Sequence, residues 1–154
     1  MGRTIGVISD THGLLRPGLV AALGGTDLII HAGDVGDEAL LQALRAIGPP
    51  LHAVRGNCDS AALGLPPTAV VEVGAATLYV LHDLGRLDLD PRAAGFAAVI
   101  SGHSHCPAVE HQDGVLFLNP GSAGPRRFSL PVSMARVHVD GAGRLRAQLV
   151  EIGP

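Results

Sequence analysis

The chain has 154 residues, 47% of them apolar, and a formal net charge of −3 at pH 7. This length suits a single domain, residues 1–154, with a substantial core, and the slightly acidic charge gives no general attraction for polyanions, which excludes a nucleic-acid coat protein. Aromatic residues are only 3%, so the core has to be built from aliphatic side chains, as in sheets covered by helices.

The sequence lacks the features of an exported or membrane-spanning protein. Its longest apolar runs fall well short of the roughly 20 residues that a membrane span needs. The first residues, MGRTIGVISD, pass directly into a strand pattern and show no signal-peptide core. We therefore expect a cytoplasmic protein without a membrane partner, in which Cys58 and Cys106 are reduced.

The first sixty residues alternate between strand and helix patterns. Short β-branched runs predict buried strands in 3–10, 27–34 and 51–59. A weak short helix is expected in 16–25, and a stronger one in 36–50, where Asp37 is the predicted N-cap and Gly-Pro-Pro the stop. This order indicates βαβ units with a parallel sheet.

The second half of the sequence predicts mostly antiparallel strands. Residues 68–83 divide into two strands around Gly74, and 97–102 form another. Residues 108–121 predict a hairpin that turns at Asp113-Gly114, and 132–152 a last hairpin around DGAG. Two stacked sheets with helices outside would accommodate this pattern.

Residues with metal-ligand chemistry follow the end of strand after strand. These sequences are Ser9-Asp10-Thr11-His12, Gly33-Asp34, Gly56-Asn57-Cys58-Asp59, His82-Asp83 and Gly102-His103-Ser104-His105. Each alone has an ordinary reading as a cap, a turn or a strand residue. Because open α/β sheets place their sites at the carboxyl ends of strands, their joint occurrence indicates one functional site.

The ordered series Asp-x-His, Gly-Asp, Gly-Asn-x-Asp, His and Gly-His-x-His resembles the calcineurin-like metallophosphoesterase superfamily. GNCD and the later NPGS look most like its small bacterial and archaeal phosphodiesterase branch. The fold that this resemblance implies is a four-layer α/β/β/α sandwich of two mixed sheets flanked by helices. It agrees with the two sheets read from the strand pattern.

The resemblance also implies a dinuclear metal centre. Carried over position by position, it assigns Asp10, His12, Asp34 and His105 to one divalent ion and Asp34, Asn57, His82 and His103 to the other, with Asp34 bridging. Imidazole, carboxylate and amide donors favour manganese, with iron, zinc and nickel as alternatives. Two such ions exceed the charge of two carboxylates by about two, so an anionic phosphate is attracted.

The implied activity is that of a phosphodiesterase. A metal-bridging hydroxide would attack phosphorus while the metals stabilise the developing charge, and we assign Asp34, Asn57, Cys58 and His103 as catalytic residues. The expected substrates are small or cyclic phosphodiesters, such as 2′,3′-cyclic nucleotides, or nucleic-acid ends. The absence of a basic patch and the scarcity of aromatic residues argue against tight nucleic-acid binding.

Two positions depart from the superfamily pattern. Cys58 stands where a His usually helps to protonate the leaving group, which disfavours alkyl monoesters; a buried structural thiol is the alternative reading. Asp83 stands in place of a common Gly after His82, and is expected to alter the turn and the affinity for the second metal.

The remaining predictions concern the substrate and the partners. In FLNPGSAGPRR, Ser122 is expected to contact the phosphate through a backbone donor, and Arg126 or Arg127 through a guanidinium; two solvated arginines are the alternative. A homodimer through the strand VSMARVHV is conceivable. The competing function is a non-catalytic metal-binding scaffold for protein interactions, since one eukaryotic trafficking subunit resembles this fold.

Overall fold

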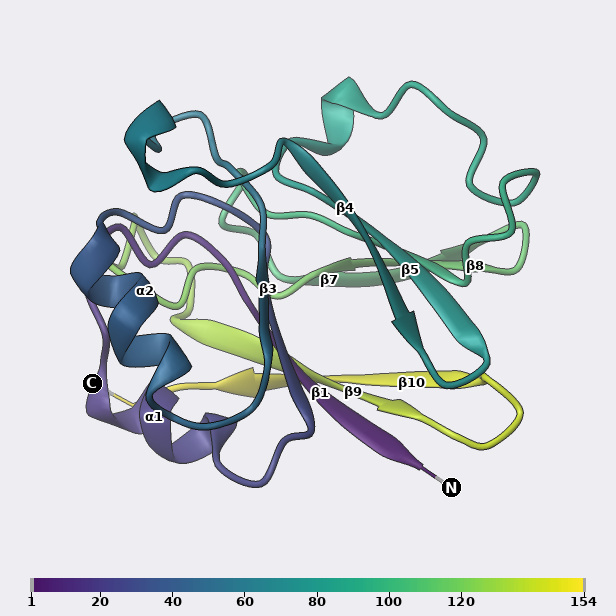
Figure 1. Ribbon diagram of the computed structural model, residues 1–154, viewed down its shortest axis with the longest axis horizontal. Helices are drawn as coiled ribbons and strands as arrows, with labels where there is room; N and C mark the ends of the chain where they lie inside the picture. Colours follow the sequence, from purple (N-terminus) through teal and green to yellow (C-terminus); the bar gives the residue numbers. More distant parts are fainter. Residues whose placement is uncertain (1, 154) are drawn as a thin grey trace.

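The first sheet combines the N-terminal and C-terminal strands of the chain. In the computed structural model, which describes residues 2–153, its strand order is β10-β9-β1-β2-β3 (Figure 1). The bounds are β1 Arg3–Ile8, β2 Leu28–His31, β3 Leu51–Ala53, β9 Ser133–Val139 and β10 Leu145–Glu151. β1, β2 and β3 run parallel, whereas β9 is antiparallel to β1 and to β10. The sheet is therefore mixed.

The second sheet is built from the middle of the chain, in the order β4-β5-β6-β8-β7. Its strands are β4 Thr68–Val73, β5 Ala76–Leu81, β6 Ala98–Ile100, β7 Ala108–Gln112 and β8 Val115–Asn119. β5, β6 and β8 are parallel, and β4 and β7 add antiparallel edges. The expectation of a mostly antiparallel second half holds for four of its six strand pairings, which include those of β9 with β1 and β10. The pairings of β5 with β6 and of β6 with β8 are parallel, because residues 82–97 and 101–114 are long enough to return the chain.

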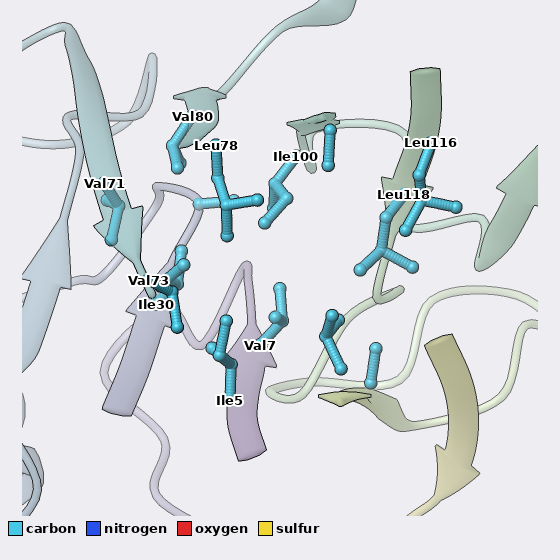
Figure 2. Close-up of a cluster of buried hydrophobic side chains, with 14 of the residues drawn as sticks. Ile5, Val7, Ile30, Val71, Val73, Leu78, Val80, Ile100, Leu116 and Leu118 are labelled. Carbon is cyan, nitrogen blue, oxygen red and sulfur yellow. The ribbon is translucent and has the colours of Figure 1, made fainter. Parts of the chain in front are cut away.

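Period-two alternation along the strands produces the core between the sheets. Ile5, Val7 and Ile30 of the first sheet face Leu78 and Val80 of the second (Figure 2). The intervening side chains point outward, where Ile8 and Ile29 pack beneath the helices. Fully buried aliphatic side chains thus fill both sides of the first sheet, as the low aromatic content of the chain predicts.

Two helices cover the outer face of the first sheet. α1 spans Pro17–Leu23 and begins at a proline, and α2 spans Glu38–Arg45 (Figure 1). The carboxylate of Asp37 accepts a hydrogen bond from the backbone N–H of Leu40 at 2.9 Å, which confirms Asp37 as the N-cap. No helix in the described range has the length and hydrophobicity needed to span a bilayer.

The outer face of the second sheet carries a thinner layer. Two 3₁₀ turns interrupt the loops, η1 at Ala61–Leu63 and η2 at Leu84–Arg86. Leu87, Leu89 and Phe96, from the segment after η2, pack against Tyr79 and Val99 of the sheet. The sandwich of two mixed sheets is confirmed, and its fourth layer is this segment rather than a long helix.

Candidate metal centre

Seven polar side chains from five loops meet where the parallel strands end. The loops after β1, β2, β3, β5 and β6 carry them, and hydrogen bonds between loops connect the two sheets at this point: the N–H of His103 donates to the carboxylate of Asp10 at 3.1 Å. We call these seven residues the donor cluster: Asp10, His12, Asp34, Asn57, His82, His103 and His105. The structure therefore brings together all of the ligand positions expected from the sequence.

Most of the donor cluster has an unusual backbone conformation. Asp10, His12, Asp34, His103 and His105 have φ angles between 47° and 70°. Residues other than glycine rarely adopt this left-handed region, and each instance costs of the order of 1–3 kcal/mol. The surrounding contacts must offset this strain. Such strain is typical of functional sites, where the direction of the side chains has to be kept at the expense of a favourable backbone conformation.

Close packing of the loops accounts for two of the motif glycines. A Cβ atom at Gly56 would collide with the backbone nitrogen and the carboxylate of Asp34. At Gly102, a Cβ atom would collide with the Ser9 hydroxyl. The Gly-Asn and Gly-His motifs therefore need glycine because neighbouring loops approach there, at φ angles outside the left-handed region.

Asp10 is oriented so that one carboxylate oxygen is bound within the protein and the other faces the cluster. Oδ2 accepts hydrogen bonds from the Ser9 hydroxyl at 2.6 Å and from the backbone N–H of His103 at 3.1 Å. Oδ1 is buried without a hydrogen-bond partner. It lies 3.3 Å from Nε2 of His105, 3.7 Å from Nε2 of His12 and 3.9 Å from Nε2 of His82.

Asp34 lies between the two halves of the cluster. Its Oδ1 accepts the backbone N–H of Cys58 at 2.8 Å, and its Oδ2 lies 3.2 Å from Nε2 of His82 and 3.7 Å from Nε2 of His12. Burial opposes ionisation, but the hydrogen bonds from His82 and Cys58 outweigh it and hold the pKa of Asp34 well below its ordinary value. Asp34 is therefore a carboxylate at neutral pH.

The second half of the cluster consists of His82, Asn57 and His103. Nδ1 of His82 is 2.8 Å from the carbonyl oxygen of Ala32, so this nitrogen carries hydrogen and donates. Its Nε2 then faces two oxygens, Oδ1 of Asn57 at 2.9 Å and Oδ2 of Asp34. Oδ1 of Asn57 is also 3.1 Å from Nδ1 of His103.

This arrangement fits a cation. A neutral His82 would direct its Nε2 lone pair at two oxygen atoms, which is repulsive unless positive charge lies between them. Burial lowers the pKa of His82, yet its hydrogen bonds to Asp34 and Ala32 raise it overall, which shows that the position favours positive charge. Nε2 of His12 and Nδ1 of His105 are also buried without partners.

Three groups of side chains have donor atoms within 4.8 Å of one another and could hold a metal ion. They are Asp10-His12-His105, His12-Asp34-Cys58 and Asp10-Asp34-His82. The first agrees with the site expected around Asp10. Asp10 and Asp34 each belong to two of these groups, whereas the family resemblance assigned Asp34 alone as the bridging ligand.

Buried polar contacts behind the cluster fix the loops that carry it. The carboxylate of Asp59 accepts the backbone N–H groups of Val35, Gly36 and Gly56, and so joins the loops after β2 and β3. His31 is fully buried and joins the loops after β1 and β2. Its Nδ1 accepts from the N–H of Gly33 at 3.1 Å, so Nε2 donates to the hydroxyl of Thr11 at 2.8 Å.

Asp83 and Cys58 are the two positions that depart from the family pattern, and the structure shows what surrounds each of them. Asp83 has a φ of −109°, so glycine is not required there, and its side chain caps η2 by accepting the N–H of Gly85. The turn after His82 is therefore not strained by Asp83.

Cys58 is exposed and free, which excludes the buried structural thiol. Its sulfur belongs to the group of possible ligands that contains His12 and Asp34.

The structure separates the three residues expected to contact the phosphate. Ser122 is buried, and its hydroxyl hydrogen-bonds to the carbonyls of Asp10 and Pro125, so its side chain holds the loop; the expected contact of its backbone N–H with the phosphate stays a prediction. Arg126 and Arg127 are exposed. Burial lowers the pKa of His105, and the charge of Arg127 lowers it further, which places Arg127 near the cluster.

Comparison with known proteins identifies the family. Residues 4–142 match the model of the calcineurin-like phosphoesterase superfamily domain. The chain belongs to this superfamily. A probable metallophosphoesterase of Methanocaldococcus jannaschii is 34% identical over 96% of the chain and 81% of its own length.

Solved structures of similar proteins extend over nearly the whole chain. A conserved Streptococcus pneumoniae protein described as a predicted phosphoesterase is 27% identical, with a TM-score of 0.75, and covers 100% of this chain and 94% of its own. A novel archaeal phosphodiesterase is 20% identical, with a TM-score of 0.76 and coverages of 96% and 99%. Entamoeba histolytica Vps29 complexed with Zn²⁺ is 22% identical, with a TM-score of 0.75 and coverages of 96% and 98%.

Sequence reasoning identified only part of the support of the superfamily's motifs: His31, three residues before Asp34, was expected either to support the site or to pack in the sheet, and Asp59 was expected to orient its own loop, as its bond from Gly56 shows. Ser9 was noted only as part of a strand end, and the contact of His31 with Thr11 had no local signature. Ser9 directly precedes Asp10, so a hydroxyl beside a candidate ligand is the signal that could have identified it. The tie from His31 to Thr11 depends on the pairing of β1 with β2, which only the fold reveals.

Proposed function

We propose that this chain is a divalent-metal-dependent phosphodiesterase that acts on small or cyclic phosphodiesters at a dinuclear centre. The observation that carries the proposal is the donor cluster itself. It places two carboxylates and imidazole nitrogens against one another, with Oδ1 of Asp10 and Nε2 of His12 unpartnered. Buried polar atoms without partners are costly in a folded protein, and bound cations would satisfy them.

The proposed division of the ligands is the one that the family resemblance implies. Asp10, His12, Asp34 and His105 would hold one ion, and Asp34, Asn57, His82 and His103 the other, with manganese as the proposed metal. Bound there, two divalent ions would act as Lewis acids on a phosphoryl oxygen and activate water. The chain's own contribution is to keep Asp34 ionised and His105 neutral, and to fix the carboxylate of Asp10 through Ser9.

Two features favour diesters over alkyl monoesters. The position of the usual family histidine holds the thiol of Cys58, whose pKa is raised by partial desolvation and then by Asp34; a thiol is a weaker proton donor than imidazolium. The fold is shared with an archaeal phosphodiesterase. Arg127, whose charge acts on His105, is the proposed contact for a phosphate oxygen of either ester class.

The proposal is tested with metal-stripped protein. Hydrolysis of bis-p-nitrophenyl phosphate and of p-nitrophenyl phosphate is measured while Mn²⁺, Ni²⁺, Zn²⁺ and Mg²⁺ are titrated separately. We expect diester cleavage to return with Mn²⁺ and to exceed monoester cleavage. Asp34→Asn should lower kcat at least a hundredfold, because it removes the charge that both ions share.

Asp113→Asn is the matched control for the Asp34 variant. Asp113 lies at the tip of the β7–β8 hairpin with a φ of 51°, which asparagine also tolerates, so full activity is expected. If no metal restores either activity although calorimetry shows metal binding, the protein is not a phosphoesterase of this kind.

The competing function is a non-catalytic scaffold that binds other proteins through this fold. The observation in its favour is the likeness to Vps29, at 22% identity. The intact donor cluster favours the enzyme, because catalysis requires all seven convergent ligands, whereas protein binding does not. Metal binding without hydrolysis in the experiment above would move the search from substrates to protein partners.

A further inference from the structure

Two cavities open on either side of one wall of the donor cluster. The smaller has a volume of about 290 Å³ and the larger of about 800 Å³. Among the described residues, His103 and Asp83 line both cavities, and Asn57 and His82 line the larger one as well. Both spaces therefore start at the half of the cluster formed by Asn57, His82 and His103, and they diverge from there.

The smaller cavity is mainly apolar. Leu84 of η2, Ala108 of β7 and Phe117 and Leu118 of β8 contribute to its wall. Its volume is at the lower end of the range of roughly 300–1,000 Å³ that small-molecule pockets occupy. A compact apolar or aryl group fits this space.

The larger cavity has a different chemistry. Arg55 and Arg86 provide guanidinium donors, Asp83 and Asp88 provide carboxylate acceptors, and Tyr79 adds a phenol ring. The charges of these arginines and aspartates balance, so the space has no preference for a second anion. Donors and acceptors around a volume of this size suit the hydroxyls and the heterocycle of a nucleoside.

The geometry points to a substrate with two unequal ester arms, in which the larger cavity binds a nucleoside-sized polar arm and the smaller cavity binds a compact apolar arm. A diester carries two substituents on a tetrahedral phosphorus, so a phosphate held beside His103 needs two diverging spaces, whereas a monoester needs one. This inference rests on the proposed function and adds the substrate class, which is a diester of one nucleoside.

Filling each cavity in turn tests the inference. Thr68, at the start of β4, lines the larger cavity, and Ala108 lines the smaller. The substrates are thymidine 5′-(p-nitrophenyl phosphate) and bis-p-nitrophenyl phosphate, with Mn²⁺. We expect Thr68→Phe to raise KM for the thymidine ester at least tenfold and clearly less for the bis-aryl ester. Ala108→Phe should raise KM for both diesters by a similar factor.

Matched controls are available on the same strands. Val70 and Gln112 lie an even number of residues from Thr68 and Ala108, hence on the same faces of β4 and β7, but outside both cavities. Val70→Phe and Gln112→Phe should leave both KM values at the wild-type level. Melting temperature and Mn²⁺ affinity are measured for all four variants, and only folded, metal-binding variants are compared.

The outcomes separate this inference from the proposed function. Wild-type protein that cleaves neither diester with any metal contradicts the proposed function, whereas cleavage with KM values insensitive to either filled cavity contradicts only the two-arm inference. Equal effects of Thr68→Phe on both diesters would overturn the nucleoside assignment. Calorimetry with thymidine 5′-monophosphate does not depend on turnover: we expect binding that Thr68→Phe weakens at least tenfold, and no binding to the metal-loaded wild type would overturn the assignment.

Discussion

The hydroxyl of Ser9 donates a hydrogen bond of 2.6 Å to Oδ2 of Asp10, and both residues are fully buried. Because this bond and the N–H of His103 occupy Oδ2, the lone pairs of Oδ1 are directed at the imidazoles of the donor cluster. Ser9 is thus a positioning residue for Asp10, comparable to the outer-shell partners that orient ligands in metalloproteins.

Ser9→Ala should weaken metal binding without unfolding the protein. Loss of an orienting partner typically lowers metal affinity about 10–100-fold, and we expect this range in calorimetric titration with Mn²⁺. Thr26→Val is the control, because it removes another buried hydroxyl hydrogen bond, to the carbonyl of Leu23, away from the cluster. If both variants lose stability similarly and neither loses affinity, Ser9 serves the fold alone.

The chemistry of the site could be predicted from the order of the strands and the residues that follow them. Each ligand position follows a hydrophobic run, and parallel strands end on one edge, so Asp10, Asp34 and His103 were expected to meet. Asp59 and His31 could be named as supporting residues, but the groups that they contact could not be predicted. The contact between His31 and Thr11 spans 20 residues, and it requires the register of β1 against β2.

The second sheet shows a different limit of sequence reasoning. The alternation in β4 and β5 was readable, but the same alternation suits either strand direction. The direction was decided by the segment of residues 82–97, which has no helix pattern and was not recognised as a crossover. Its apolar residues Leu87, Leu89 and Phe96 cover the sheet, which the sequence alone did not reveal.

The stability of the metal-free protein should depend on His31 in acid. Burial lowers the pKa of His31 to about 3, below its ordinary value near 6.5, so between these values the unfolded state binds the extra proton. Stability therefore rises with pH across this window and is lost as the pH falls, by about 1.4 kcal/mol per pH unit from this group.

A comparison with His31→Gln isolates this contribution from the other histidines. Glutamine keeps a donor and an acceptor but does not titrate. Between pH 6.5 and pH 5 the wild type should lose roughly 2 kcal/mol more of its free energy of unfolding than the variant does, as measured by urea denaturation. Parallel losses in the two proteins would mean that His31 is not kept neutral by the fold.

The two neighbouring arginines should differ in their effect on substrate binding. The charge of Arg127 lowers the pKa of His105, so this arginine is expected near the phosphate, whereas Arg126 is not among the groups that shift the pKa of His105. Since the side chain is exposed, its interaction is worth about 1 kcal/mol, so Arg127→Ala should raise KM for a diester roughly fivefold, and less at high salt. Arg126→Ala should have the smaller effect; the reverse order would assign the contact to Arg126.

The effect of Cys58 on kcat should increase with the pKa of the leaving group. Its exposed thiol lies near His12 and Asp34, and in the metal-free protein desolvation and Asp34 raise its pKa, so the thiol carries a proton that it can donate. Cys58→Ala should lower kcat for diphenyl phosphate at least tenfold but change bis-p-nitrophenyl phosphate less than threefold, because nitrophenolate leaves without protonation. Cys58→His should restore or exceed the diphenyl phosphate rate. An equal loss on both diesters in Cys58→Ala would indicate that the thiol shapes the site and transfers no proton.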